Sequence, residues 1–168
     1  TQIDWAELYN QNRMSADGAI YAMDERVERI ARAEFLLRFS TELGQNLTIG
    51  YGVRGRYDSS RNYKRMADLM GATHLRDVDY YLLDDDTYSH SMRNNLLDDD
   101  PTVVEGDRFS YDYALQRRSV VAYAGVEYST ARWQVEADVQ VGGASIQRRG
   151  YFEKELFPEE ASYGRSEA

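Results

Sequence analysis

The stretch WQVEADVQV, residues 133–141, decides the fold class that this sequence predicts. Its odd positions hold Trp, Val or Ala, and its even positions hold Gln, Glu or Asp. Because successive side chains of a β-strand point to opposite faces, this period of two predicts a strand with one apolar and one polar face. It is the cleanest amphipathic strand in the chain.

A second alternating run lies immediately upstream and predicts the partner strand. Residues 120–128 carry Val, Ala or Tyr at every even position, and the short segment Ser-Thr-Ala-Arg, residues 129–132, separates the two runs. We therefore predict a β-hairpin within residues 111–150. Tyr128 and Trp133 flank its turn, the position where membrane barrels place aromatic side chains at the bilayer interface.

The same design occurs earlier in the chain, where residues 27–58 predict a first hairpin around the tight turn Gly44-Gln45-Asn46. One parity of its first strand is apolar, and it comprises Ala31, Ala33, Phe35, Leu37, Phe39 and Leu43. The other parity is ionic, with Glu28, Arg32, Glu34, Arg38 and Glu42. The return strand sets Leu47, Ile49, Tyr51 and Val53 against Thr48, Gly50, Gly52, Arg54 and Arg56.

Two architectures use strands of this kind, a soluble β-sandwich and an outer-membrane β-barrel. The interleaved Glu and Arg favour the barrel, because lumen-facing strands can pair ionically in a wet or plugged interior. A run from residue 27 to residue 43 also exceeds the roughly ten residues that a strand needs to cross a bilayer. We expect Phe35, Leu37, Phe39, Ile49, Val53, Val135, Ala137 and Val139 to face lipid, and Arg32, Glu34, Arg38, Arg54, Arg56, Glu136 and Asp138 to face the lumen.

The remaining segments are predicted as surface loops of that barrel. Residues 1–26 form one loop, with a short helix that Asp4 caps and that Asn10-Gln11-Asn12 breaks. Residues 59–110 form a long extracellular loop, with a helix expected over residues 61–70 and closed by Gly71. Residues 151–168 begin the next loop. Short turns that alternate with long loops are typical of outer-membrane barrels.

Composition excludes several classes of protein. The formal net charge of -9 argues against nucleic acid as a partner, since phosphate binding needs a basic surface. The absence of cysteine excludes disulfides and thiolate metal sites. No window approaches eighteen consecutive apolar residues, so no transmembrane helix is predicted. The first residues lack the features of a signal peptide, and we expect a mature or excised segment.

The sequence carries no catalytic constellation, and we expect neither enzymatic activity nor a cofactor or metal. His74 and His90 are too few and too isolated for a zinc site, and no Ser, His and acid grouping suggests a triad. The acidic triplets at 84–86 and 98–100 lack the spacing of a calcium loop and are interpreted as solvated loop charge. The candidate ligand-contacting residues of the long loop are Asp77, Asp79, Tyr80, Tyr81 and Tyr88, for which loop packing is the competing interpretation.

Several motifs, in order along nearly the whole chain, resemble the barrel domain of TonB-dependent receptors of the Bacteroidetes type. The strongest is VEGDRFSYDY, residues 104–113, which is similar to the stretch with which that family returns to the barrel after a long loop. The others are DWAELY at 4–9 with Asn12-Arg13, residues 62–71, Phe157-Pro158, and YGRSE at 163–167. Together they identify the chain as a fragment of such a barrel, containing four consecutive strands.

The resemblance implies a roughly 22-stranded barrel, closed by a plug domain and energised by the TonB complex. Such a transporter imports a scarce nutrient, which can be an iron chelate, cobalamin, a glycan or a peptide. Its partners would be outer-membrane lipid, the plug, the remaining strands, TonB through segments absent here, and the small nutrient ligand. The isolated fragment is expected to self-associate through its uncovered faces and edges. The alternative is a soluble β-rich module that recognises a carbohydrate or protein through the loop rich in Tyr and Asp.

Overall fold

The computed structural model describes residues 2–82, 92–158 and 163–167. Strands account for 61% of the structure and are mostly antiparallel, which confirms the expected all-β class. The chain divides into two compact units, which are described separately below. The loop unit comprises Thr1–Arg29, Ser60–Leu115 and Arg148–Ser166, and the hairpin unit comprises Ile30–Ser59, Gln116–Gln147 and Glu167–Ala168.

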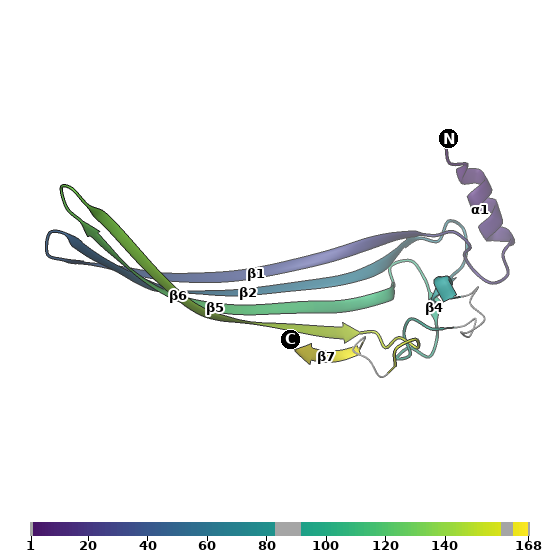
Figure 1. The fold of residues 1–168 in the computed structure, drawn as a ribbon. Helices are drawn as coiled ribbons and strands as arrows, with labels where there is room; N and C mark the ends of the chain where they lie inside the picture. The colour runs from purple at the N-terminus through teal and green to yellow at the C-terminus, as the bar shows by residue number, and fades with distance from the viewer. Residues whose placement is uncertain (1, 83–91, 159–162, 168) are drawn as a thin grey trace. The chain divides into compact units, whose positions relative to one another are not determined.

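Five strands pair into one sheet in the order β1-β2-β5-β6-β7, which is open among the described residues (Figure 1). These strands are β1 (Met23–Leu43), β2 (Leu47–Asp68), β5 (Arg108–Ser129), β6 (Gln134–Tyr151) and β7 (Tyr163–Glu167). A two-stranded sheet pairs β3 (Leu75–Arg76) with β4 (Thr102–Val103) in antiparallel register, and a 3-10 helix, η1, spans Tyr80–Leu82. No helix among the described residues has the length and apolarity needed to span a membrane.

Both predicted hairpins are present, and the first is longer than expected. β1 begins at Met23 and β2 continues to Asp68, whereas the alternating pattern predicted residues 27–58. The second hairpin, predicted over residues 111–150, extends from Arg108 to Tyr151. These long strands leave residues 69–107 between the hairpins, so the predicted loop at 59–110 is shorter at both ends.

The helix expected over residues 61–70 is wrong, because β2 occupies most of that segment. Met66 shows the reason: its backbone N donates to Asp107 O at 2.9 Å, and Gly106 N donates to Met66 O at 2.9 Å. This ladder joins the end of β2 to the chain that enters β5. Hydrogen bonds to a segment about forty residues away in sequence therefore override a local helical pattern.

Helix α1, Trp5–Met14, confirms the predicted cap and corrects the predicted break. The Asp4 carboxylate accepts a hydrogen bond from Glu7 N at 3.2 Å, which satisfies one free donor of the first turn. The helix nevertheless runs through residues 10–12. The Asn12 side chain is buried, donating to Tyr21 O at 2.7 Å and accepting from Tyr21 N at 2.9 Å. Asn12 therefore fastens the helix to the following segment and does not end it.

The loop unit has a small hydrophobic core of its own. Leu75 of β3 and Val103 of β4 are paired in register, and both side chains are buried. The same cluster contains Met66, which is 1% exposed, and Phe109 at the start of β5. The core residues are Ala19, Met66, Leu69, Leu75, Val103 and Phe109.

The hairpin unit is built differently, because none of its described hydrophobic residues is buried. Thr130 N donates to Trp133 O at 2.7 Å within the turn between β5 and β6, and Ser129 N donates to Asn46 O at 2.8 Å, which joins the end of β5 to the start of β2. Gly44, with φ of 75°, supplies the left-handed conformation that the first turn needs. The ring of Phe35 lies over Gly55, so an aromatic side chain covers a glycine of the neighbouring strand.

The tail differs from the predicted loop start, because residues 163–167 form β7 at the edge of the main sheet next to β6. The main sheet thus has five strands where four were expected. The reason is that a run of five residues is too short to show an alternating pattern, and its pairing with β6 is visible only in three dimensions.

Candidate functional site

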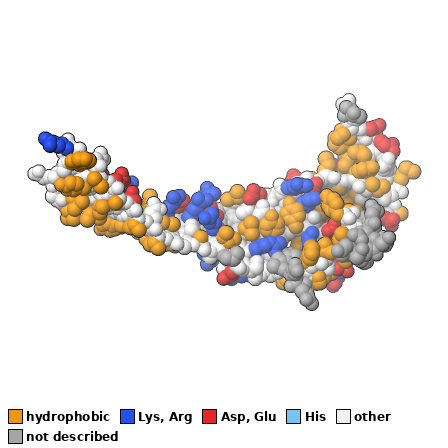
Figure 2. Space-filling model, viewed as in Figure 1, with side chains coloured by type: hydrophobic (Ala, Val, Ile, Leu, Met, Phe, Trp, Pro, Cys, Tyr) orange, Lys and Arg blue, Asp and Glu red, His pale blue; other side chains and the backbone are white. Residues whose placement is uncertain are grey.

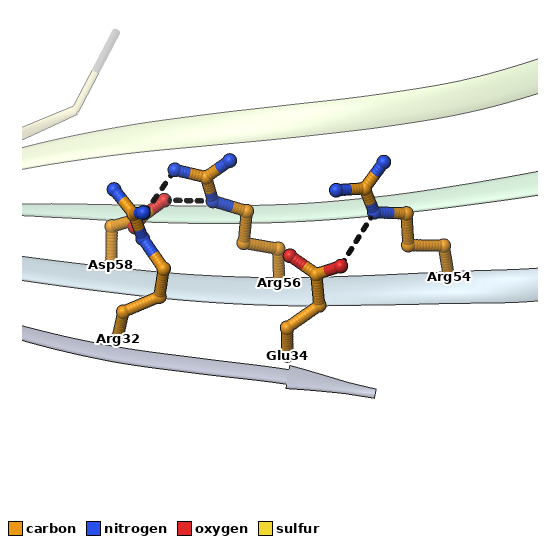
Figure 3. A network of polar contacts seen from close by, with 5 residues as sticks. All are labelled: Arg32, Glu34, Arg54, Arg56 and Asp58. Carbon is orange, nitrogen blue, oxygen red and sulfur yellow. Dashed lines mark hydrogen bonds and ion pairs between the residues drawn. The ribbon is translucent and has the colours of Figure 1, made fainter. Parts of the chain in front are cut away.

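Ionic side chains of β1 and β2 form a network on one face of the hairpin unit, where Asp58 joins two arginines (Figure 3). Its Oδ1 accepts from Arg32 Nε at 2.6 Å, and its Oδ2 accepts from Arg56 Nε at 2.6 Å. Beside it, Arg54 Nε donates to Glu34 Oε1 at 3.0 Å. The predicted ionic pairing between neighbouring strands is therefore present, and Asp58 is a member that the sequence reasoning missed.

Most of this network is solvated, whereas its central carboxylate, Asp58, is 20% exposed. The side chains of Arg32 and Arg54 are 58% and 52% exposed, and that of Glu34 is 36% exposed. Ion pairs in such surroundings contribute little to stability, because water screens them and long side chains lose entropy when they pair. The network therefore keeps this face wet and gives it charge.

Three other residues predicted to face the lumen line one cavity of the hairpin unit. Arg38, Glu136 and Asp138 line an open cavity of about 240 Å³, together with Tyr123 and Thr48. Cationic and anionic side chains from β1 and β6 thus line the same polar cavity. This is the arrangement expected if the three residues lie on one face of the sheet. The assignment of this space to a barrel lumen remains a prediction.

The residues predicted to face lipid are largely uncovered. Phe35, Leu37 and Phe39 are 54%, 52% and 51% exposed, and Val135 and Val139 are 57% and 65% exposed. Ala137 is also exposed, whereas Ile49 and Val53 are half-buried. Figure 2 shows hydrophobic side chains gathered over the ends of the hairpins. An apolar area of this kind marks a surface that meets an apolar solvent or a partner.

In the loop unit, the predicted ligand residue Asp77 is a centre of hydrogen bonding. Its Oδ1 accepts from Asn94 Nδ2 at 2.8 Å and from Ser110 N at 2.9 Å, and its backbone N donates to Pro101 O at 2.7 Å. The residue is 7% exposed, and this burial raises the pKa of its carboxyl above 3.8, while the bonds from Asn94 and Ser110 oppose the shift. Asp77 thereby holds three segments of backbone together.

The other candidate ligand residues do not share a surface with Asp77. Asp77 lines a cavity of about 210 Å³ that Asp79, Tyr80 and Tyr81 do not line. Asp79 accepts a hydrogen bond from Tyr81 N at 3.1 Å, the Tyr80 hydroxyl donates to Arg76 O at 2.9 Å, and the Tyr81 side chain is 98% exposed. Tyr88 lies outside the described residues. A role of these residues in ligand binding stays a prediction.

His74, Asp98 and Asp100, which the sequence does not predict as metal ligands, form local hydrogen bonds. Asp98 accepts from Asp100 N at 3.2 Å, and Asp100 accepts from Thr102 N at 2.9 Å. The hydroxyl and the backbone N–H of Thr102 lower the pKa of Asp100. His74 forms a hydrogen bond with the Thr73 hydroxyl at 2.9 Å. Within the described ranges no group of three His, Cys, Asp or Glu side chains could hold a metal ion, and His90 and residues 84–86 lie outside those ranges.

The sequence reasoning also missed a cluster of charged and aromatic residues in the loop unit. Asp112 is 4% exposed and binds both Arg61 and Arg108, and each of these guanidinium groups stacks on a tyrosine ring, Tyr151 or Tyr63. Arg61 and Asp112 are 51 residues apart, so no local pattern pairs them. Arg108 and Asp112 are close in sequence, but Ser110 between them has a φ of 66°, so the backbone interrupts the regular alternation there and no strand pattern predicts their pairing.

Comparisons with protein-family models, curated proteins and solved structures found no match for this chain. The resemblance to TonB-dependent receptors therefore rests on the sequence motifs. The features that bear on function are the apolar and ionic faces of the hairpin unit and the buried polar residues of the loop unit.

Proposed function

We propose that this chain forms part of the wall and surface loops of a TonB-dependent outer-membrane transporter, which imports a scarce nutrient. The observation that carries the proposal is the character of the hairpin unit. Apolar side chains such as Phe35, Leu37 and Val139 are more than half exposed, while a neighbouring parity carries the ionic network around Asp58. This alternation of apolar and ionic side chains is expected of a barrel strand, which has one face toward lipid and the other toward a polar interior.

Two further features support the proposal. The hairpin strands have 18 to 22 residues, where a tilted strand needs about ten to cross a bilayer, so each can cross and project beyond it. The turn at residues 44–46 is short, whereas residues 69–107 connect the two hairpins. This difference matches barrels with short periplasmic turns and long extracellular loops, and we place residues 69–107 outside the cell.

As part of such a transporter, the chain would contact outer-membrane lipid, the plug domain and the remaining strands of the barrel. Energy would come from the TonB complex through segments outside this chain. The nutrient would meet the loop unit, whose cavity beside Asp77 also exposes Asp98, Asp100 and Arg108.

The experiment uses the two parities of one strand as matched controls. In the full-length transporter, single cysteines replace Leu37 or Val139 and, in separate variants, the adjacent Arg38 or Asp138. Each cysteine carries a fluorophore, and the bilayer contains lipids with spin-labelled chains. We expect strong quenching at Leu37→Cys and Val139→Cys and little at Arg38→Cys and Asp138→Cys, because only one parity meets hydrocarbon. Equal quenching at both parities would refute membrane-spanning strands here.

A second candidate function is a soluble β-rich module that binds a carbohydrate or protein. The loop unit favours it, because this unit has its own core and a cavity of about 210 Å³ lined by Asp77, Asn95, Asp98 and Arg108. Carboxylate and amide groups of this kind suit a polyhydroxylated ligand. Light scattering of the isolated chain without detergent separates the two functions. A monomer at high concentration would favour the soluble module, and association would favour the barrel wall.

A further inference from the structure

The main sheet has two edges, and they differ in length and regularity (Figure 1). β1 ends the strand order on one side and, among the described strands, pairs only with β2. Its other side therefore presents backbone N–H and C=O groups along 21 residues. The opposite edge ends in β7, which has five residues and contains Gly164 at a φ of 84°. The β1 edge is the longer and more regular surface for a further strand.

The backbone of β1 does not block such pairing. The strand contains no proline, and none of its residues has a positive φ. Apart from Val27, all of its side chains are exposed. Charged side chains on an edge strand oppose pairing when like charges meet, and they favour it when opposite charges meet. The order of the charges along β1 therefore decides whether a further strand fits.

The charges of β1 are ordered so that the strand complements a second copy of itself. An antiparallel pair that matches two copies over their full length has its twofold axis at Ala33, the middle residue of Met23–Leu43. In this register Arg32 lies opposite Glu34 of the second copy, and Glu28 lies opposite Arg38. The symmetry repeats both contacts. Each of them stabilises the pair, because opposite charges directly across two strands attract.

The apolar residues match in the same register. Ile30 lies opposite Leu36, and the apolar odd positions of one copy meet the odd positions of the other, so both faces continue across the junction. A shift by two residues, the smallest that keeps the faces matched, sets Arg32 opposite Arg32 or Glu34 opposite Glu34. Like charges directly opposite each other are destabilising. The full-length register is therefore favoured over its neighbours.

The ion pairs within one copy leave groups available for this contact. Arg32 uses its Nε for Asp58 and keeps a side chain that is 58% exposed. Glu34 uses its Oε1 for Arg54 and is 36% exposed. The Nη groups of Arg32 and the second carboxylate oxygen of Glu34 can therefore meet across the junction. The ionic network of one copy would continue into that of the other.

We propose that the free edge of β1 binds a second copy of this chain as an antiparallel strand, with Ala33 on the twofold axis. The inference goes beyond the proposed function, because it concerns the strand edge and not the apolar face. In the proposed transporter another strand of the wall would occupy this edge. The pairing is therefore a property of the 168-residue chain by itself.

The first test uses single cysteines in the 168-residue chain, which has no cysteine of its own. A mild detergent covers the apolar face and leaves the edge free, which separates this pairing from association through that face. Ala33→Cys brings two thiols together on the axis, where opposed Cβ atoms lie about 4.5–5.5 Å apart. A short bis-maleimide should therefore link them into a covalent dimer.

The register predicts which other positions react. Two Val27→Cys chains should not be linked to each other, because residue 27 lies opposite residue 39 and the two thiols are roughly 40 Å apart. A mixture of Val27→Cys and Phe39→Cys chains should give the dimer instead. Equal linkage of Ala33→Cys and of Val27→Cys alone would show unspecific association and would overturn the proposal.

The second test changes the charges and measures the dimer by sedimentation equilibrium in the same detergent. Arg38→Glu should weaken the dimer roughly tenfold, because it sets like charges opposite each other at two symmetric positions. Glu28→Arg combined with Arg38→Glu should restore it, since the pair is then reversed. The matched control is Arg132→Glu, which makes the same change at the exposed turn between β5 and β6 and should leave the dimer unchanged.

Two results would overturn the proposal. The native chain could remain monomeric in detergent at high concentration, or the reversed pair could fail to restore the dimer. Neither result bears on the lipid quenching at Leu37→Cys and Val139→Cys in the full-length transporter. The self-pairing edge and the transporter wall can therefore fail independently.

Discussion

The loop unit and the hairpin unit use the same kinds of side chain in opposite ways. The loop unit buries Met66, Leu69 and Phe109 in a core and ties its chain together through the buried polar residues Asn12 and Asp77. The hairpin unit buries none of its described hydrophobic residues. The first arrangement is that of a small globular domain, and the second leaves its apolar side chains exposed, as the proposed contact with lipid would require. The two units thus differ in how their apolar side chains are covered within the described residues.

The largest expected effect comes from a cavity in the loop unit. Met66→Ala should destabilise that unit by about 2–5 kcal/mol, because it removes a side chain that is 1% exposed from a packed core. Hydrogen exchange of the full-length protein should then accelerate in residues 60–82 and 92–115 and stay unchanged in the hairpin unit. The matched control is Leu37→Ala, at a position 52% exposed, where a fluid solvent fills the space. Comparable opening in both variants would break the comparison.

A smaller effect should reveal how the hairpin unit is held together without a core. A Cβ at Gly142 would lie 2.7 Å from Val120 O and 2.8 Å from Val121 Cγ2, whereas a Cβ at Gly143 meets nothing within 4 Å. Gly142→Ala should therefore cost about 1–3 kcal/mol, since the backbone of β5 has to move. Gly143→Ala should change stability little. Thermal unfolding of both variants in detergent measures the difference, and equal costs would argue against close strand packing at Gly142.

The smallest effect concerns the buried Asp77 and depends on pH. Burial raises the pKa of this carboxyl above 3.8 in the folded state, so folding disfavours its charged form. The stability that Asp77 contributes is greatest below its unfolded pKa and decreases as the pH rises through the folded pKa. Relative to Asp77→Asn, the native loop unit should lose stability as the pH increases. Exchange rates of residues 92–115, corrected for intrinsic chemistry, measure this, and a pH-independent difference would contradict it.

The elements that sequence reasoning predicted well are those that depend on local pattern. The turn at residues 44–46, the cap at Asp4 and the two amphipathic hairpins follow from turn residues, a capping side chain and a period of two. The ionic pair of Arg54 with Glu34 also follows, because two ionic parities on adjacent strands bring opposite charges together. The exposure of the apolar parity was predicted, while the lipid that would cover it remains a proposal.

The elements that sequence reasoning missed depend on distant partners. Residues 61–70 have a helical pattern, yet Met66 pairs with the chain at Gly106 and Asp107. Asn12 was interpreted as a helix breaker, yet its side chain finds buried backbone partners at Tyr21 and Leu69. A local window contains neither partner. Long-range hydrogen bonds decide such positions, because a buried polar group that loses them is costly.

By itself, the sequence determined the faces of the strands, since side-chain direction in a strand alternates whatever the strand pairs with. The tertiary structure decided where β2 ends, that residues 163–167 join the sheet, and that Arg61 meets Asp112 across 51 residues. The physical reason is that alternation is a property of one chain segment, whereas pairing is a competition among all segments. Its outcome depends on hydrogen bonds and burial that exist only after the chain has folded.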